Sequence, residues 1–185
     1  MVFGKEFAEI YDDLYEVLGS RKGAYAEVLN FFRSAKKGTV LDIGCGTGKL
    51  DEDLHALGFE VLGIDPSAEM IAVAKKGEKE GLHFEVSSFQ DFSAGDTFDH
   101  LVAAFNVFAY FRPEELPTFF KKAASLLSDD GFLLFDFWKN DEHFDVKPFG
   151  YNLVRTRKGP YLRLVQTRMK NDQVRIRYGF VSLHN

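Results

Sequence analysis

The chain has 185 residues, a net charge of −5 and a hydrophobic fraction of 45%, which suit one globular domain. Its basic residues are scattered along most of the chain, so the composition offers no footprint for nucleic acid, and its single cysteine, Cys45, excludes an internal disulfide and a zinc cluster. The N-terminus has no apolar signal region, and no segment approaches the roughly 18 apolar residues of a membrane span. We therefore expect a cytoplasmic protein with no membrane or metal partner.

The chain opens with two predicted helices. Apolar residues three and four positions apart predict one helix over residues 6–18 and another over about 23–35. Lys36-Lys37-Gly38 ends the second helix, because cations and a glycine are favoured at a helix C-terminus.

From residue 39 to residue 137, short apolar runs alternate with helical stretches. The runs predict strands at 39–43, 60–64, 82–86, 98–105 and 131–137. The turn Asp129-Asp130-Gly131 announces the last strand, and the helix before it is expected to include Leu127. Because nearly continuous apolar strands alternate with helices, we expect an α/β fold with a doubly wound, mostly parallel, Rossmann-like sheet covered on both faces.

The pattern changes after Phe137. Strands are predicted at 151–156, 161–169 and 174–181, joined by turns at Lys158-Gly159-Pro160 and Asn171-Asp172. These segments predict a C-terminal antiparallel meander rather than another β-α unit.

A glycine loop, Gly44-Cys45-Gly46-Thr47-Gly48, follows the first predicted strand and opens a helix. Glycine lets a ligand approach the backbone, and ligands of parallel sheets bind at the carboxyl ends of the strands. The loop is not a P-loop, because the spacing of its glycines is wrong and Leu50 stands where a hydroxyl is needed. The dinucleotide fingerprint has a third glycine where this chain has Lys49, which counts against nicotinamide binding.

An acidic residue, Asp65, follows the next predicted strand and precedes Pro66 and Ser67. A carboxylate at this place can accept hydrogen bonds from both hydroxyls of a ribose. The alternative is a helix cap, with Asp65 or Ser67 at the N-terminus of the next helix. In combination with the glycine loop, we favour the ribose interpretation.

On these residues the chain resembles the class I S-adenosylmethionine-dependent methyltransferases over about residues 6–137. The run Val40-Leu41-Asp42-Ile43-Gly44-Cys45-Gly46-Thr47-Gly48 matches the family's first motif, and Gly63-Ile64-Asp65 matches its second. Ser87-Ser88-Phe89 replaces the usual Gly-Asp of the third motif, so Ser88 is implied to contact adenine without a charge. The segment Glu9-Ile10-Tyr11-Asp12 is similar to the lid helix of small-molecule methyltransferases, including amino-sugar N-methyltransferases.

The resemblance implies transfer of a methyl group from S-adenosylmethionine to a small-molecule acceptor by in-line displacement. Such a reaction depends on orientation and exclusion of water rather than on a metal or a protein nucleophile. It also implies one methyltransferase-like domain over 1–185, with a helical lid (1–37), a cofactor-binding core (38–137) and an antiparallel extension (138–185). The extension does not map onto the helix and reversed hairpin that usually close the family's sheet, so we expect an acceptor region that is shortened or incomplete.

The resemblance also assigns roles to individual residues. The glycine loop would pack against the methionine part, Asp42 would steer its ammonium, and Met70 with Phe89 would sandwich the adenine. The residues implied in cofactor binding are Asp42, Gly44, Cys45, Gly46, Gly48, Asp65, Pro66, Met70, Ser88, Phe89 and Phe105. The residues implied in catalysis are Asn106 as a polar contact to the acceptor, His143 as a general base and Tyr11 as a cover over the cofactor.

Several alternatives stay open. Met70 has a rival interpretation as a core residue and Tyr11 as a half-buried residue of its helix, while Cys45 and His100 are interpreted as packing residues. The run Asp51-Glu52-Asp53 suits the positive end of a helix. For the whole chain, the alternatives are a cofactor-binding regulatory or truncated module without catalysis and a nicotinamide-dependent oxidoreductase. The identity of the acceptor is not in the sequence.

Overall fold

The structure is a computed structural model that describes residues 4–18, 22–137, 149–170 and 173–183. The chain divides into two compact units, one made of Met1–Ala8 with Arg21–Trp138 and the other of Glu9–Ser20 with Lys139–Asn185. Helix α1 (Lys5–Leu18) therefore begins in the first unit and continues in the second.

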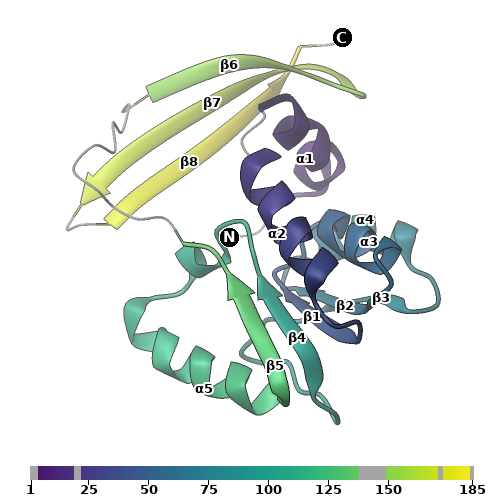
Figure 1. Cartoon of the computed structure of the whole chain (residues 1–185). Coiled ribbons are helices and arrows are strands. Elements are labelled where there is room, and N and C mark those ends of the chain that lie inside the picture. Colours follow the sequence, from purple (N-terminus) through teal and green to yellow (C-terminus); the bar gives the residue numbers. More distant parts are fainter. Residues whose placement is uncertain (1–3, 19–21, 138–148, 171–172, 184–185) are drawn as a thin grey trace. The chain divides into compact units, whose positions relative to one another are not determined.

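The first unit alternates helices and strands, as the sequence predicts (Figure 1). In chain order its elements are α2 (Lys22–Ser34), β1 (Thr39–Ile43), α3 (Lys49–Ala56), β2 (Glu60–Asp65), α4 (Ala68–Ala74), η1 (Lys75–Gly77), β3 (Leu82–Val86), β4 (Phe98–Ala103), η2 (Val107–Tyr110), η3 (Pro113–Glu115), α5 (Leu116–Leu126) and β5 (Leu127–Phe135). The five strands form one sheet in the order β3-β2-β1-β4-β5, and every neighbouring pair is parallel. The expected doubly wound parallel sheet is confirmed.

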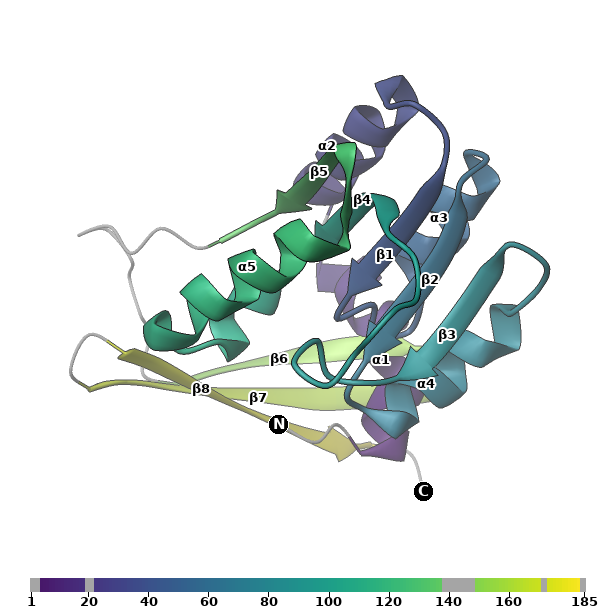
Figure 2. The ribbon, with the colours of Figure 1, turned by 90° about the horizontal axis from the view of Figure 1, so that it is seen from below.

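Both faces of this sheet are covered by helices (Figures 1 and 2). Because successive side chains of a strand point to opposite faces, β1, β2, β4 and β5 contribute to two cores, whereas the buried residues of β3 belong to one. Val40 and Val102 belong to the cluster that includes residues of α2, α3 and α4. Leu41 and Leu101 belong to the cluster that includes residues of α5. Packing against these two cores, on opposite faces of the sheet, fixes the positions of the carboxyl ends of the strands.

The fifth strand begins earlier than the sequence predicts. Leu127 leaves α5 and starts β5, so the predicted helix residue and the predicted strand start at Gly131 are both wrong. The expected turn residues lie inside β5. Phe98 of β4 pairs with Leu127 of β5, and the next pair joins His100 to Phe132, so the pairing skips residues 128–131 of β5. Ladder pairs on both sides of this irregularity hold the segment in the strand.

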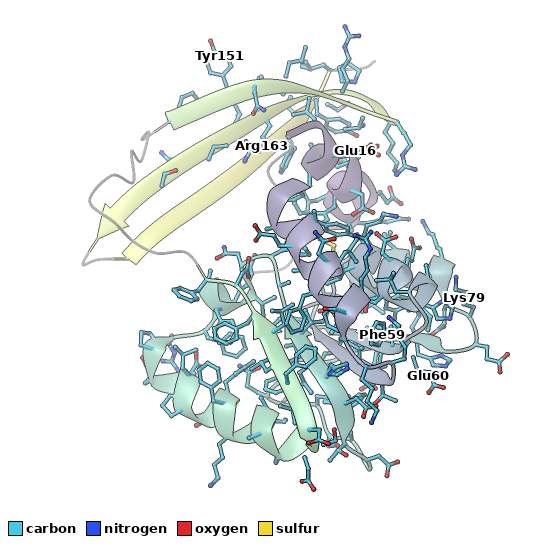
Figure 3. The ribbon with its side chains drawn as sticks, viewed as in Figure 1. Glu16, Phe59, Glu60, Lys79, Tyr151 and Arg163 are labelled. Atoms are coloured by element: carbon cyan, nitrogen blue, oxygen red, sulfur yellow. The ribbon has the colours of Figure 1, made fainter. Side chains whose placement is uncertain are left out.

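The second unit contains an antiparallel sheet of β6 (Phe149–Thr156), β7 (Gly159–Lys170) and β8 (Gln173–Ser182) in that order, which confirms the predicted meander. Within the same unit, the buried carboxylate of Asp13 on α1 accepts hydrogen bonds from the backbone N and the Nε of Arg157, both at 2.8 Å. Lys158 forms an ion pair with Glu9 beside it. Tyr151 projects from β6 and is 73% exposed (Figure 3).

Among the residues that the structure describes, none of the helices has the length and apolar character needed to cross a membrane.

Candidate functional site

The predicted site residues of the first unit gather at one edge of the parallel sheet. The glycine loop follows β1, Asp65 ends β2, Ser88 and Phe89 follow β3, and Phe105 with Asn106 follow β4. Because β3, β2, β1 and β4 are consecutive neighbours and run parallel, their carboxyl ends meet at the same edge. The structure thus brings together segments that are up to about 60 residues apart in the chain, as in the pairing of Val40 with His100.

The loop after β1 takes a conformation that favours glycine at three places. Gly44, Gly46 and Gly48 have φ angles of 78°, 58° and 79°, in the left-handed region that other residues resist. The backbone N atoms of Gly44 and Cys45 donate to the carbonyl of Ile64 at 2.8 and 3.0 Å, so the loop is fastened to β2. A Cβ at Gly48 would lie 2.7 Å from the ring of Phe84. Space as well as backbone angle therefore requires glycine there.

Asp65 faces this loop from the end of β2. Its Oδ2 accepts from the backbone N of Gly46 at 3.1 Å, and its Oδ1 accepts from the backbone N of Ser67 at 2.8 Å. Burial raises the pKa of Asp65, and these two backbone hydrogen bonds act against the rise. Each carboxylate oxygen has two lone pairs, so both oxygens can still accept a hydroxyl.

The helix cap that competes with the ribose interpretation is made by Ser67. Its Oγ accepts from the backbone N of Met70 at 3.3 Å at the start of α4. Asp65 supports the cap through the amide of Ser67 but faces the glycine loop with its other oxygen. Ser67 therefore caps the helix and Asp65 presents an accessible carboxylate, with the exposed Pro66 between them.

A buried pair of acids, Asp42 and Asp51, lies next to the loop. Asp42 is 3% exposed and Asp51 is 0% exposed. Asp42 pairs in register with Gly63 of β2, and a Cβ on Gly63 would lie only 2.6 Å from Oδ1 of Asp51. Burial raises the pKa of Asp42 to about 7, and burial also raises the pKa of Asp51 well above its ordinary value.

The sequence placed Asp51 correctly in the first turn of a helix but gave no role beyond the helix dipole. In the structure the buried residues of α3 are Leu50, Asp51 and Leu54. The signal was present, because a residue three positions before Leu54 shares its helical face. Cys45 packs against the same core, and burial raises the pKa of its thiol, so it remains protonated.

The chain turns sharply where β4 ends. Phe105 and Asn106 have φ angles of 64° and 73°, which ends the strand at Ala103 instead of the predicted residue 105. Left-handed conformations cost non-glycine residues about 1–2 kcal/mol each and concentrate at functional sites. The backbone N of Asn106 donates to Oδ1 of Asp136 at 2.8 Å, which holds the turn against the end of β5.

Phe105 is held from the other side by α2. Its ring stacks on Tyr25 with centroids 5.5 Å apart and planes 15° apart. The oxygen of the Tyr25 hydroxyl lies 2.5 Å from Oδ2 of Asp53 and 3.0 Å from the carbonyl oxygen of Lys49, and its one proton is donated to one of these two acceptors at a time. Tyr25 and Asp136 were missed as site residues, because only the folded sheet brings them to the turn after β4.

Two residues predicted to contact adenine are buried in the first unit. Met70 is 1% exposed and Phe89 is 4% exposed, with the ring of Phe89 4.5 Å from that of Phe119. Both side chains therefore contribute to the core. Ser88 donates to Oδ2 of Asp91 at 2.6 Å and accepts from the backbone N of Asp91 at 3.2 Å, so its hydroxyl organises a local turn.

The remaining predicted residues fall elsewhere. Tyr11 lies on the α1 segment of the second unit, 4.6 Å from the ring of Tyr15, and its role over a cofactor stays a prediction. His143 lies outside the described residues. His100 is buried, with Nε2 2.8 Å from the carbonyl of Lys36 and its ring stacked on Phe132, which confirms that it packs. In the described part of the chain, no three acidic, histidine or cysteine side chains are grouped so as to hold a metal ion.

Comparison with known proteins gives this arrangement a family context. Residues 40–131 match the protein family described as "Methyltransferase domain". The chain is 36% identical over 131 residues to an uncharacterized methyltransferase of Staphylococcus carnosus, a match that covers 71% of this chain and 60% of that protein. The chain spans between 52% and 60% of the length of the first three curated relatives that it matches.

Solved structures share the fold. The structure of the sugar N-methyltransferase KedS8 from Streptoalloteichus superposes with a TM-score of 0.74 at 23% identity, covering 98% of this chain and 80% of that chain. The structure of CalS10, an amino pentose methyltransferase from Micromonospora echinaspora with S-adenosylmethionine bound, superposes with a TM-score of 0.68 at 22% identity, covering 90% of this chain and 80% of that chain. At these identities the likeness establishes a common fold.

Proposed function

Because the chain belongs to the class I S-adenosylmethionine-dependent methyltransferase family, we propose that it transfers a methyl group from S-adenosylmethionine to a small-molecule acceptor. CalS10, which is similar in fold, is an amino pentose methyltransferase with this donor bound, and KedS8 is a sugar N-methyltransferase. These neighbours support both the donor and a small acceptor.

The residues at the sheet edge fit such a donor by their chemistry. The donor has a ribose, which needs hydrogen-bond acceptors, and two positive charges, on its sulfonium and its ammonium. Asp65 supplies acceptor oxygens beside the loop, and Asp42 and Asp51 supply carboxyl groups beneath it. The glycine loop leaves its backbone open to close approach.

The reaction asks mainly for orientation from the protein. When bound, S-adenosylmethionine supplies an activated methyl group, which a lone pair of the acceptor takes in line while the bonding electrons return to sulfur. Asp65 would fix the ribose, and the glycine loop would fix the methionine part. Phe105 and Asn106 would face the acceptor, because the strained turn holds them at the same edge of the sheet.

The observation that carries the donor assignment is the hydrogen bond between Gly46 and Asp65, because it joins the two predicted halves of a nucleoside-binding site. Calorimetry with S-adenosylmethionine and S-adenosylhomocysteine tests the assignment. We expect both to bind, and we expect Asp65→Ala to weaken donor binding by about 10- to 100-fold, the contribution of hydrogen bonds to a charged group.

A matched control is Glu60→Gln, which removes one exposed carboxylate at the other end of the same strand. This variant should bind the donor as the unaltered chain does. If neither ligand binds the unaltered chain, the donor assignment is wrong.

The small-molecule acceptor needs its own experiment. Transfer of labelled methyl groups from S-adenosylmethionine is measured to amino sugars, other small amines and small hydroxylated compounds, with RNA and a protein mixture as comparisons. Labelling of a small compound supports the proposal, whereas labelling confined to RNA or protein contradicts it. The cytoplasmic location and the lid role of residues 1–37 stay predictions.

A further inference from the structure

The buried acids beside the glycine loop present a problem of protonation. Neither oxygen of Asp51 is reached by a hydrogen-bond donor from elsewhere in the described residues, although both oxygens are shielded from water. The carboxyl group of Asp42 lies beside Asp51, because Asp42 pairs in register with Gly63 and a Cβ on Gly63 would lie 2.6 Å from Oδ1 of Asp51. Ionised carboxylate oxygens can only accept hydrogen bonds, so the two groups can bond to each other only when one of them carries a proton.

The charged groups around the pair favour a retained proton. Asp65 at the end of β2 acts on Asp42, and Glu52 on α3 acts on Asp51, and both are acidic. Burial, and after it the charges of Asp51, Asp42 and Asp65, raise the pKa of the Cys45 thiol, so the thiol adds no negative charge beside the pair. Burial and like charge therefore act in the same direction, and the pair keeps a proton near neutral pH.

A cation at the glycine loop would reverse this balance. A positive charge near a carboxyl group favours its ionised form. Asp42 lies only two residues before Gly44, so a ligand held by the loop is bound close to the pair. The methyl donor carries two positive charges against one carboxylate, and its net positive charge compensates the negative charge that proton release leaves on the pair.

We propose that Asp51 shares a proton with Asp42 in the free protein and that the pair releases this proton when the cationic methyl donor binds at the glycine loop. The inference rests on the donor proposed above. Asp51 is a positioning residue in this scheme, because it acts on the donor through Asp42. Proton release couples donor affinity to pH, by up to about tenfold for each pH unit over which the pair titrates.

The test is calorimetry of S-adenosylmethionine binding near pH 7 in two buffers that differ in ionisation enthalpy. The difference between the two heats gives the number of protons released. We expect the unaltered chain to release a large fraction of one proton, and donor affinity to rise between pH 6 and pH 7. Asp51→Asn replaces the acid by an amide that donates to Asp42, so we expect no measurable proton release and an affinity independent of pH.

Glu60→Gln is the matched control, because Glu60 is an exposed carboxylate at the start of β2 (Figure 3). It should release the same number of protons as the unaltered chain. Donor binding without proton release in the unaltered chain overturns the inference and leaves the proposed function intact. Equal release from Asp51→Asn overturns it as well.

Failure of the donor to bind would count against the proposed function instead. The pair is then tested alone, by carbon-13 NMR titration of aspartate carboxyl groups in the free protein. We expect two carboxyl resonances to titrate well above the ordinary range and to be altered in Asp51→Asn. If no aspartate titrates in this way, the shared proton does not exist. The unaltered chain supplies this result even if the variant does not fold.

Discussion

At the scale of single residues, the sheet edge is defined by backbone conformations that few residues adopt. Gly48 and Gly58 both have positive φ angles, but only Gly48 lies against another side chain. Asn106 has a similar φ angle and keeps it because Asp136 accepts from its backbone N. The effect of a left-handed backbone angle and the effect of a clash with a neighbouring side chain can therefore be tested separately.

The first prediction compares two glycines. Gly48→Ala should lower the free energy of unfolding by about 3 kcal/mol, because it adds a left-handed alanine and places a methyl group against the Phe84 ring. Gly58→Ala should lower it by only about 1 kcal/mol, because nothing lies within 4 Å of the added Cβ. Urea unfolding followed by circular dichroism measures both. Equal losses would contradict the importance of space at Gly48.

The second prediction concerns the strained turn after β4. Asn106→Gly should raise the free energy of unfolding by about 1 kcal/mol, because glycine accepts the left-handed conformation freely. The same change should lower kcat/KM for methyl transfer by about tenfold, if the Asn106 side chain makes one hydrogen bond to the acceptor. Urea unfolding and a methyl-transfer assay give the two values. A variant that is less stable, or equally active, contradicts this account.

At the scale of elements, helix α4 begins at a serine that is distinct from Asp65, the acid beside the glycine loop. Ser67 caps the helix with its hydroxyl, while its backbone N donates to Asp65. A change of the Ser67 side chain should therefore affect the helix without affecting the position of the carboxylate.

The third prediction follows from this separation. Ser67→Ala should lower the free energy of unfolding by about 1 kcal/mol, the usual effect of losing an N-cap. Donor affinity, measured by calorimetry, should stay within twofold of the original value (roughly 0.4 kcal/mol) because the amide of residue 67 remains. Ser125→Ala is the control, since Ser125 is exposed near the end of α5. A large loss of donor affinity in Ser67→Ala would contradict the division of roles.

Most elements of the first unit could be predicted because the spacing of its apolar residues agrees with the positions of the residues that end helices and strands. The strands 39–43 and 82–86 have the predicted bounds, since each is a short apolar run between clear breaks. The start of β5 could not be predicted, because the pairing of Leu127 with Phe98 overrides the local turn signal. The glycine loop and Asp65 were recognisable by spacing, whereas Asp136 becomes a partner of Asn106 only through the pairing of β4 with β5.

At the scale of the whole molecule, the buried acids make stability depend on pH. The pKa of Asp42 is raised from 3.8 to about 7 in the folded protein, so the folded state holds a proton that the unfolded state has lost between these values. Stability is therefore highest below the unfolded pKa and falls as pH rises through the folded pKa.

The fourth prediction is the size and sign of this dependence. The free energy of unfolding should fall by on the order of 4 kcal/mol between about pH 4 and pH 7. The pKa of Asp99 is lowered by its hydrogen bonds to Thr39, so its contribution is lost only at more acidic pH. Urea unfolding at a series of pH values measures the curve, and Asp51→Asn should flatten it. A rise in stability over this range contradicts the protonated pair.

The register of β1 also predicts an order of folding events. Val40 pairs with Val61, 21 positions later, and with His100, 60 positions later. Closing the longer loop costs about 1 kcal/mol more in chain entropy, so contacts between β1 and β2 should form first. Pulse-labelled hydrogen exchange during refolding should therefore protect the amides of β2 before those of β5, and the reverse order would contradict this. The glycine loop and Asp65 lie in the part that pairs first, so the proposed donor site would be assembled before the turn at Phe105 and Asn106 is held against β5.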